Sequence, residues 1–360
     1  MKTIQITTMF FILSLIILSC NNETKDNQIP MSDNIGNIDT IFICDIKENI
    51  DVIQDINDVA FLNDSTFFII SNKQLIKYNS NGEQMQIYNH IGGGPHEYIT
   101  PSLMQINDSS IFVWCNTSLK LIEFDTNGKP RKEITNYRKA IKNFSVYENK
   151  YIFFYKSDVA EPGVIDVYDI KEDRVIKSVG TFSEEDIILL LLASKPEIII
   201  HYNYVYFVKP SSLKIFRFNI ENFNLETVSD INDTDFSVTK VEEAVNIINT
   251  QRNKAFEYLQ KNSITDNIFL VNDGLIIKSE VGIYELNEKE KRIERDKRFN
   301  KFYFHPFSKI DSDNYGLVWK TKSNPNLYNY INYNSNIFII KNSLNNEVEN
   351  SKLYKIQFKT

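Results

Sequence analysis

The chain repeats one pattern of apolar and polar positions along most of its length. Residues 61–88 and 105–134 each read as an apolar strand, a polar turn, a second apolar strand, a short polar break, a strand led by leucine, an Asn-Gly turn and a final strand. Short apolar runs bounded by turn residues are the pattern of β-strands joined by hairpins. Each repeat therefore predicts one antiparallel sheet of four strands.

Weaker copies of the pattern follow, and six units are found in all. Their first turns align at Asp64, Asp108, Glu148, Tyr202, Asn272 and Ser312. The uninterrupted steps are roughly 40 to 44 residues, which is the length of a four-stranded propeller blade. One such sheet cannot bury both of its faces, whereas sheets stacked radially cover one another and leave only short edges. The predicted fold class is all-β, a six-bladed β-propeller of four-stranded antiparallel blades over residues 38–360.

The ends of the chain and the tight turns refine this prediction. We expect the early strand at 38–46 to pair with the C-terminal strand at 352–359, so that the last blade contains both chain ends and the open edges are removed. Asn-Gly pairs at 81–82 and 127–128 supply the positive φ that hairpins between outer strands need. Many aromatic residues, 25 Phe and 19 Tyr, also favour strands over helices.

Two segments depart from the repeated pattern of strands and turns. Thr239 and Glu242 have the spacing of a capping box, and an inserted amphipathic helix is predicted over residues 239–261. Its expected apolar face consists of Val241, Val245, Ile248, Phe256 and Leu259. This helix either covers a blade or shapes a ligand site. Ser183 and Asp186 have the same spacing before an apolar run that stops ahead of Pro196, and this run fits either a short helix or a buried strand.

The N-terminus is predicted to carry an export signal. Lys2 precedes an apolar run over residues 9–18, which is too short to cross a membrane as a helix but typical of a signal peptide. The sequence "ILSC" at 17–20 resembles the lipobox of bacterial lipoproteins, in which the cysteine is acylated and becomes the first residue. The resemblance implies a signal peptide at 1–19 and lipidation at Cys20. An ordinary signal peptide followed by an unmodified cysteine is the alternative.

Residues 20–37 are polar and are expected to form a flexible tether. Asp is absent directly after Cys20, which favours the outer membrane in bacteria that use that sorting signal. Glu23 and Asp26 are similar to the acidic export tags of surface lipoproteins in Bacteroidetes-like organisms. The expected location is therefore the cell envelope, with a lipid anchor in the outer membrane, and both the periplasmic and the surface face stay open.

Charge and cysteine content exclude several functions. The formal net charge is −7, which repels a phosphate backbone and makes nucleic acid an unsuitable partner. The basic stretch at 289–298 is interleaved with acids and is interpreted as a solvated hairpin or outer strand, with a binding patch as the alternative. Cys44 and Cys115 lack metal-like spacing and are interpreted as small buried hydrophobes, with a disulfide as the alternative.

The segment "IGGGPHEY" at 91–98 is the least ordinary part of the chain, because three glycines before Pro95 cannot continue a strand or helix. It is similar to the G-x-G-P-x-E-Y motif of six-bladed β-propeller lipoproteins of Bacteroidetes, which are relatives in shape of the NHL-type propellers. The matching positions are Gly92, Gly94, Pro95, Glu97 and Tyr98, with His96 where a small residue is common. The resemblance implies a propeller in the cell envelope, and no settled biochemical activity.

Two interpretations of this segment are open. In the structural one, Gly92 and Gly93 adopt backbone angles closed to other residues and Pro95 makes Gly94 extended, which gives a stiff corner between blades. Glu97 then accepts hydrogen bonds across the junction, and Tyr98 is wedged between sheets. In the other, glycine amides form an anion-binding concavity beside His90, and a metal site is a weaker variant. The predicted ligand-binding residues are Gly92, Gly93, Gly94, His96, Glu97 and Tyr98. No Lys-Ser/Thr pair follows the glycines, so the segment is not a P-loop.

Two functions from different classes fit the chain. The first is an envelope lipoprotein that binds a glycan, peptide or protein partner and is not an enzyme. The alternative is a lyase or a lactone or glycan hydrolase, which requires at least two Asp, Glu or His side chains at one end of the central channel. No G-x-S-x-G, H-E-x-x-H or paired C-x-x-C motif occurs, and we predict no cofactor, no metal and no named catalytic residue. His201 and His305 are interpreted as hydrogen-bonded packing residues rather than ligands, and the Tyr/Asn alternation at 324–336 fits either sugar contact or a polar hairpin.

Overall fold

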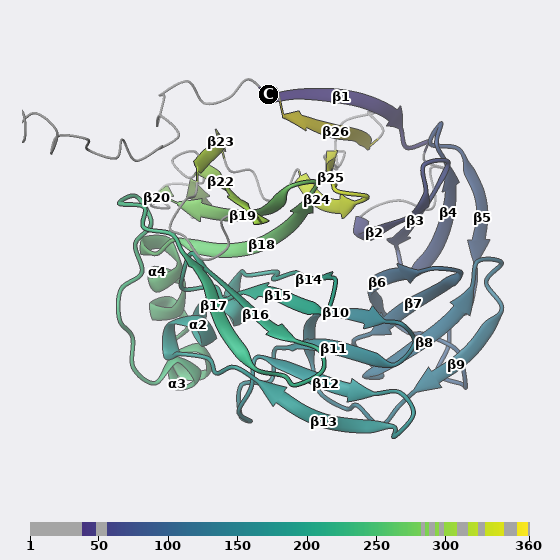
Figure 1. Ribbon diagram of the computed structural model, residues 1–360, viewed down its shortest axis with the longest axis horizontal. Coiled ribbons are helices and arrows are strands. Elements are labelled where there is room, and N and C mark those ends of the chain that lie inside the picture. Colours follow the sequence, from purple (N-terminus) through teal and green to yellow (C-terminus); the bar gives the residue numbers. More distant parts are fainter. Residues whose placement is uncertain are drawn as a thin grey trace, which may run out of the picture. The chain divides into compact units, whose positions relative to one another are not determined.

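Six four-stranded antiparallel sheets surround a common axis (Figure 1). The computed structural model describes residues 38–47, 56–281, 285–287, 292–294, 299–307, 316–322, 328–341 and 351–358. These belong to one compact unit, Ile35–Thr360. The predicted all-β fold of six blades with four strands each is therefore confirmed. The predicted signal peptide at 1–19 and tether at 20–37 lie outside the described residues.

The first three blades follow one another along the chain. Blade 1 consists of β2 (Ile56–Asn63), β3 (Thr66–Ser71), β4 (Gln74–Asn79) and β5 (Gln84–Tyr88). Blade 2 consists of β6 (Pro101–Asn107), β7 (Ser110–Cys115), β8 (Lys120–Asp125) and β9 (Pro130–Ile134). Blade 3 consists of β10 (Ile141–Tyr147), β11 (Tyr151–Lys156), β12 (Ile165–Asp169) and β13 (Arg174–Val179).

The last three blades contain the insertions and the closure. Blade 4 consists of β14 (Ile198–His201), β15 (Tyr204–Val208), β16 (Lys214–Asn219) and β17 (Leu225–Asp230). Blade 5 consists of β18 (Ile264–Val271), β19 (Gly274–Val281), β22 (Phe299–Pro306) and β23 (Gly316–Lys322), with a separate hairpin of β20 (Glu285–Asn287) and β21 (Arg292–Glu294). Blade 6 consists of β24 (Tyr328–Tyr333), β25 (Asn336–Lys341), β26 (Lys352–Phe358) and β1 (Ile38–Asp45).

The ring closes as expected. β1 pairs antiparallel with β26, from Ile38 opposite Phe358 to Asp45 opposite Lys352. Figure 1 shows the purple first strand beside the yellow last one. The predicted Asn-Gly turns are also confirmed, since Gly82 and Gly128 have φ values of 71° and 83°. Blade 6 thus uses both ends of the chain to cover an edge that either end alone would leave open.

The sixth unit begins later than predicted. Ser312 lies outside the described residues, and Gly316–Lys322, which was assigned to the sixth unit, is the outer strand of blade 5. The turn of blade 6 that corresponds to Asp64 lies at Asn334 and Ser335, between β24 and β25. The cause is the β20–β21 hairpin, whose strand-turn-strand pattern imitates the outer half of a blade. Within the basic stretch at 289–298, β21 forms the expected hairpin strand.

The helices differ in how well they match expectation. α2 (Glu184–Leu192) begins with a capping box in which Ser183 and Asp186 exchange both bonds, so the strand alternative is wrong. The helix expected over 239–261 is two helices, α3 (Ala244–Thr250) and α4 (Arg252–Lys261), separated by a break in helical geometry at Gln251. The predicted capping box of this second segment is absent from the start of α3, which has no side-chain cap bond.

Tertiary contacts explain why no helix begins at Thr239. The Thr239 hydroxyl donates to Asn262 Oδ1 at 3.0 Å, and the Ala244 N–H is bound by Glu184 Oε2 at 2.7 Å. Val245 and Phe256, expected on the apolar face, are 43% and 36% exposed. Val241, Ile248 and Leu259 do pack in the apolar cluster that joins the three helices. The helices therefore cover one another and the start of β18.

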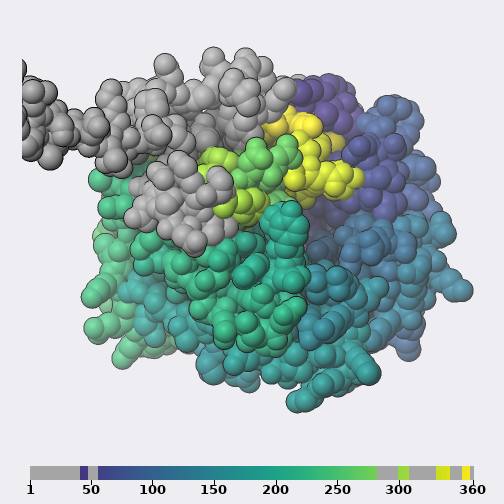
Figure 2. Space-filling view, viewed as in Figure 1, coloured from purple at the N-terminus to yellow at the C-terminus, as the bar shows by residue number. Residues whose placement is uncertain are grey.

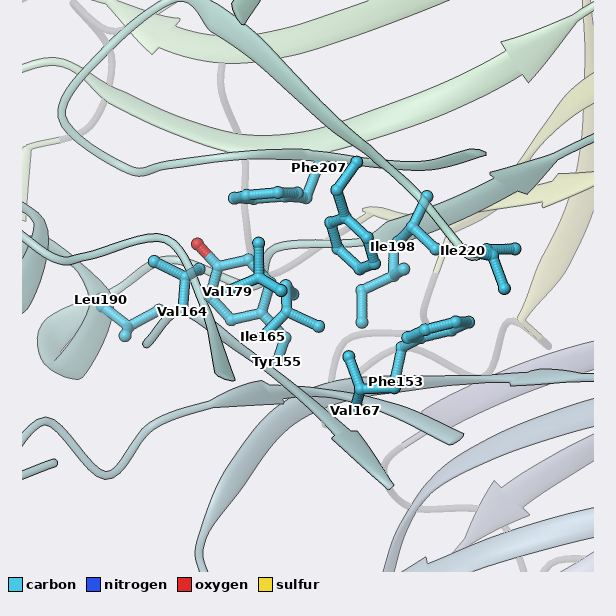
Figure 3. Packing of buried hydrophobic residues seen from close by; sticks show 12 residues of the cluster. Phe153, Tyr155, Val164, Ile165, Val167, Val179, Leu190, Ile198, Phe207 and Ile220 are labelled. Atoms are coloured by element: carbon cyan, nitrogen blue, oxygen red, sulfur yellow. The ribbon is translucent and has the colours of Figure 1, made fainter. Parts of the chain in front are cut away.

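Apolar clusters fill the spaces between neighbouring blades. Figure 3 shows the cluster between blades 3 and 4, where Phe153 and Tyr155 of β11 meet Phe207 of β15. Both faces of each sheet are covered in this way, which explains the continuous apolar runs of the second strands. Cys44 and Cys115 are buried free thiols in two different clusters, as the interpretation of small buried hydrophobes expects.

Candidate functional site

The Gly-rich segment lies between β5 and β6, where the chain crosses from blade 1 to blade 2. Tyr98 is fully buried in the cluster between these blades, and its hydroxyl donates to the Tyr88 carbonyl at 2.5 Å. The Tyr98 N–H donates to the His90 carbonyl at 2.8 Å, and His90 Nε2 lies 2.8 Å from the Gly128 carbonyl. Tyr98 therefore forms the wedge that the structural interpretation expected.

The glycines accommodate the Glu97 side chain. The Gly94 N–H donates to Glu97 Oε2 at 2.8 Å, and a Cβ at Gly92 would lie 2.0 Å from the same oxygen. None of the three glycines has a positive φ, so the expectation of special backbone angles at Gly92 and Gly93 is wrong. The residue in the left-handed region is His96, with φ 60°. The segment lacks side chains at 92 and 94 because a carboxylate occupies that space.

Blade 2 holds the same segment from the other side. Lys120 Nζ donates to the Gly94 carbonyl at 2.9 Å and lies 3.4 Å from Glu133 Oε1, while Glu133 Oε2 accepts the His96 N–H. The Gly94 amide is thus already bound by Glu97. Gly93 has open space where a Cβ would project. Ligand binding by the six predicted residues stays a prediction.

A second polar site lies where the innermost strands begin. In an antiparallel four-stranded blade the outermost strand ends on the face where the next innermost strand starts, and we call this the connection face. It carries the Gly-rich segment and the connections that contain α2, α3 and α4. Figure 2 shows that the molecule is hollowed near the middle of the ring. The channel mouth is defined here by Asp58, Lys142, Asn143, Lys195, Glu197, Asp266, Lys278 and Glu280.

Repeated β-bulges shape the mouth. The pairing of the first two strands shifts by one residue near the start of blades 1, 2, 3 and 5. The shift leaves Asn57, Ser102, Lys142 and Asp266 without a partner across the strand pair. A bulge of this kind bends the strand and turns a side chain away from its regular direction. Of these four residues, Lys142 and Asp266 belong to the channel mouth, whereas the Ser102 hydroxyl donates to the Trp114 carbonyl at 3.4 Å.

Asp58, on β2, is the first carboxyl of the mouth. Its two oxygens accept the N–H groups of Val59 at 2.9 Å and Met104 at 2.5 Å, so it also joins the inner strands of blades 1 and 2. Burial raises the pKa of Asp58 to about 7, against the lowering effect of these bonds and of the Lys195 charge.

Glu197 is the second carboxyl and lies just before β14. Burial, followed by the negative charge of Asp58, raises the pKa of Glu197 to about 8, while a hydrogen bond from Asn143 opposes the rise. The segment is fixed by Ser194, whose hydroxyl donates to the Thr265 carbonyl at 3.2 Å. α2 ends at Leu192, so the helix delivers Lys195 and Glu197 to the channel.

Two lysines of the mouth form no direct side-chain bond, although the positive charge of Lys195 acts on Asp58, Glu197 and Asp266. The ammonium groups of Lys142 and Lys195 form neither a hydrogen bond nor an ion pair with any residue that the structure describes. Lys142 is half-buried, and Lys195 is exposed. Burial lowers the pKa of Lys142, and the positive charge of Lys195 lowers it further. The two charges therefore lie close enough to repel each other.

An ion pair completes the mouth on blade 5. Lys278 Nζ lies 2.5 Å from Asp266 Oδ2, and Asp266 Oδ1 has no hydrogen-bond partner among the described residues. Burial raises the pKa of Asp266, with Lys278 opposing and Glu280 adding to the effect. Burial would lower the pKa of Lys278, but the charges of Asp266 and Glu280 outweigh it and the pKa is raised. Lys278 stays positively charged beside these two acids.

The family assignment follows from this architecture together with the sequence. Residues 44–273 match the model of the family DUF5128, described as 6-bladed beta-propeller. The chain belongs to this family. No curated protein matches the propeller chain.

Solved structures support the fold. A Bacteroides fragilis protein named "Putative exported protein" has a TM-score of 0.64 at 11% identity and covers 91% of this chain and 97% of its own. A member of the duf4221 family from Bacteroides vulgatus has a TM-score of 0.62 at 10% identity, with coverage of 90% and 97%. These likenesses show the propeller fold.

The remaining candidates are placed as follows. His201 stacks on Phe307 with ring centroids 4.5 Å apart, and His305 is fully buried, so both pack as expected. The expected hydrogen bond is wrong for His305, because neither of its ring nitrogens has a partner among the described residues. Within the stretch at 324–336, the Asn332 side-chain amide binds both backbone groups of Leu270, and this joins blades 5 and 6.

Within the described ranges, no three His, Cys, Asp or Glu side chains are grouped to hold a metal. Of the helices in these ranges, none is long and apolar enough to cross a membrane.

Proposed function

We propose that this chain is a lipid-anchored protein of the bacterial cell envelope that binds a glycan, peptide or protein partner at the channel mouth. The observation that carries the proposal is a group of charged side chains from blades 1, 3 and 5 and from the segment before blade 4, whose charges act on one another at one end of the channel. Lys142 and Lys195 form no ion pair with a described residue there. Unpaired charges in a partly buried hollow are costly for the free protein, and a ligand that pairs with them recovers that energy.

The envelope location draws on the sequence and on one structural neighbour. The lipobox-like sequence that ends at Cys20 supports a lipid anchor, and the neighbour from Bacteroides fragilis carries a name that describes export. Replacement of Cys20 by Ser is expected to move the protein from the membrane fraction to the soluble fraction and to remove the acyl mass from the N-terminal peptide. An unchanged distribution and mass would contradict the anchor.

The binding function is tested by capture from envelope extract. The full chain, solubilised in detergent, is expected to retain a glycan, peptide or protein that mass spectrometry identifies. The variant Lys195→Met/Glu197→Gln should lose it. The control Glu172→Gln/Arg174→Met removes the same two charges from an exposed ion pair in the β12–β13 turn, on the opposite face, and should retain it. Equal retention by both variants would contradict binding at the mouth.

An enzyme is the second candidate, and a specific observation favours it. Asp58 and Glu197 have pKa values raised to about 7 and about 8, so at neutral pH at least one of them carries a proton that it can donate. A carboxyl pair whose pKa values lie near the working pH is suited to general acid and base catalysis. A lyase or a lactone or glycan hydrolase would therefore turn over substrate with Glu197 as proton donor. Substrate that is bound and released unchanged would contradict catalysis.

A further inference from the structure

We propose that the cavity between blades 6 and 1 binds an aromatic carboxylate, with the ring among aromatic side chains and the carboxylate at Lys355. The cavity has a volume of about 180 Å³. Four aromatic side chains and several aliphatic ones line it, together with Asp64, Ser80 and Lys355. It shares no residue with the channel mouth, so this inference goes beyond the proposed function.

Strand register places Lys355 on the face of blade 6 that packs against blade 1. Side chains alternate along a strand, so Lys355 shares a face of β26 with Leu353, which belongs to the apolar cluster between these two blades. Lys355 lies opposite Phe338 on β25 and opposite Ile41 on β1. It is half-buried, and its ammonium group forms neither a hydrogen bond nor an ion pair with any residue that the structure describes. A lysine without a partner therefore lines a mainly apolar space.

The junction of blades 1 and 2 contains an equivalent lysine that does have a partner. Lys77 lies two residues after Leu75 on β4, and Leu75 belongs to the apolar cluster with blade 2. Lys355 has the same spacing from Leu353 on β26. The Lys77 ammonium group donates to the Thr126 carbonyl of blade 2 at 3.4 Å. The same position of the repeat is thus satisfied at one junction and left without a bond at the other.

The outer strand explains this difference. In blade 1 it ends at Tyr88, whose hydroxyl also donates to the Thr126 carbonyl, at 2.9 Å. Cys44 has the corresponding place in the strand pairing of blade 6, and it has neither a ring nor a hydroxyl. Ile43 beside it is a β-bulge residue and is 38% exposed. Ser80, which corresponds to Thr126 before an Asn-Gly turn, lines the cavity that remains.

The aromatic side chains and the volume favour a ligand with one ring. The ring centroid of Phe61 lies 4.9 Å from that of Tyr333 and 4.6 Å from that of Phe338. A further aromatic ring can join such a group in offset or edge-to-face contact. An apolar cavity of about 150 Å³ is large enough to hold benzene. A cavity of about 180 Å³ therefore has room for one ring with a short substituent.

Lys355 determines the chemistry of the substituent. A partly buried ammonium group without a partner is costly, and a carboxylate beside it forms a charge-assisted hydrogen bond. Asp64 also lines the cavity, but it is exposed, so water and salt weaken its repulsion of an anion. The half-buried lysine therefore favours a carboxylate over an amine, which would pair with Asp64 instead.

The experiment measures the binding of phenylacetate to the full chain in lipid nanodiscs by ligand-detected NMR, with empty nanodiscs as the blank. The comparison probes are 2-phenylethanol, which has the ring without the charge, phenethylamine, which has the opposite charge, and hexanoate, which has the charge without the ring. We expect phenylacetate to bind with a dissociation constant on the order of 0.1–1 mM, about five- to tenfold more tightly than each of the other probes.

Variants locate the bound ligand. Lys355→Met should weaken phenylacetate binding about five- to tenfold and leave 2-phenylethanol unchanged, whereas Lys355→Arg should retain the acid. Lys77→Met, at the equivalent lysine of blade 1, is the matched control and should have no effect. Cys44→Tyr introduces the side chain that blade 1 has at this position and should abolish binding of every probe. Thermal melting shows whether each variant is folded, and Lys355→Gln serves as a second variant at that position.

Several results would overturn the inference. Phenylacetate binding no greater than that of empty nanodiscs would show that the cavity takes no aromatic acid. Equal or tighter binding of phenethylamine or hexanoate would assign it to a different class of ligand. Unchanged affinity in both Lys355→Met and Cys44→Tyr would place the ligand elsewhere. Lys195→Met/Glu197→Gln, which tests the channel mouth, should leave phenylacetate binding unchanged, so failure of this inference is distinguishable from failure of the proposed function.

Discussion

At the scale of single residues, one carboxylate explains the Gly-rich segment. Glu97 folds back so that its Oε2 accepts the Gly94 N–H, and it occupies the space that side chains at 92 and 94 would need. Gly93, between them, has no neighbour within 4 Å of a Cβ. The three glycines look equivalent in the sequence and have different roles in the structure.

Alanine substitutions at these glycines separate the roles. Gly92→Ala should lower the free energy of unfolding by about 1–3 kcal/mol, because the new Cβ would displace the Glu97 carboxylate from its amide partner. Gly93→Ala is the matched control and should change it by less than about 0.5 kcal/mol. Urea unfolding of both variants measures the difference. Equal stability of the two would show that the space around Glu97 is not what requires glycine at 92.

Residues of the channel mouth couple stability to pH. The pKa of Glu197 in the folded chain is about 8, above its ordinary value of 4.5, so the folded state binds more protons than the unfolded state between these two values. Stability then falls as the pH rises through this window. Asp58 acts in the same direction up to its pKa of about 7. His201 and His305 act oppositely, since burial lowers their pKa values and their effect appears below their ordinary value of 6.5.

A glutamine at position 197 isolates this effect. Between pH about 6.5 and 8, wild type should lose stability on the order of 1 kcal/mol more than Glu197→Gln, which has no proton to release. Urea midpoints measured across this range test the expectation, and Glu172→Gln, at an exposed carboxyl on the opposite face, is the control. Parallel profiles for wild type and Glu197→Gln would mean that Glu197 is ionised throughout.

At the scale of elements, a capping sequence starts a helix only where no tertiary contact competes for the capping residue. The capping box of Ser183 and Asp186 forms as the sequence predicts, and α2 follows it. The same spacing at Thr239 and Glu242 does not cap a helix, because Asn262 binds both the N–H and the hydroxyl of Thr239. The competing partner is 23 residues away along the chain. Spacing within one segment could not reveal it.

Removal of the working cap should destabilise α2 measurably. Ser183→Ala removes the side-chain acceptor of the Asp186 N–H and is expected to lower the free energy of unfolding by about 1 kcal/mol. Thr250→Ala is a suitable comparison, since that exposed hydroxyl bonds only to Asn246 within its own helix, and it should change stability by about 0.5 kcal/mol or less. Similar losses in both variants would contradict a specific contribution of the cap.

At the scale of the whole molecule, the sequence repeat makes the fold predictable. It does not show which residues of different blades come together at the channel mouth. The repeat specified the four-stranded sheets, and the pairing of the two chain ends followed from the need to close a ring. The hairpin of β20 and β21 has the sequence pattern of two outer strands, so the sixth unit was predicted to begin too early in the chain. Lys142, Glu197 and Asp266 are far apart in the sequence, and they lie together at the channel mouth because their blades surround one axis. The available signal was the recurrence of polar residues at the second or third position of the inner strands, which the repeat alignment contains.

Closure of the ring gives a prediction at this scale. Removal of residues 38–45 deletes β1 and exposes the edge of β26, so blade 6 keeps three of its four strands. The shortened chain should unfold at lower urea concentration and associate through the exposed edge. A chain that lacks only residues 21–34 should retain the stability of the full propeller. Identical unfolding of the two shortened chains would show that β1 does not hold the ring closed.

Hydrogen–deuterium exchange tests the central claim most directly, because it locates the bound surface whatever the chemical identity of the ligand. The chain is compared with and without the molecule that it retains from envelope extract. The account predicts slower exchange in the segments that start the inner strands, at 56–58, 141–143, 195–198 and 264–267. Protection confined to other parts of the chain, with these four segments unchanged, would contradict the assignment of the channel mouth as the functional site.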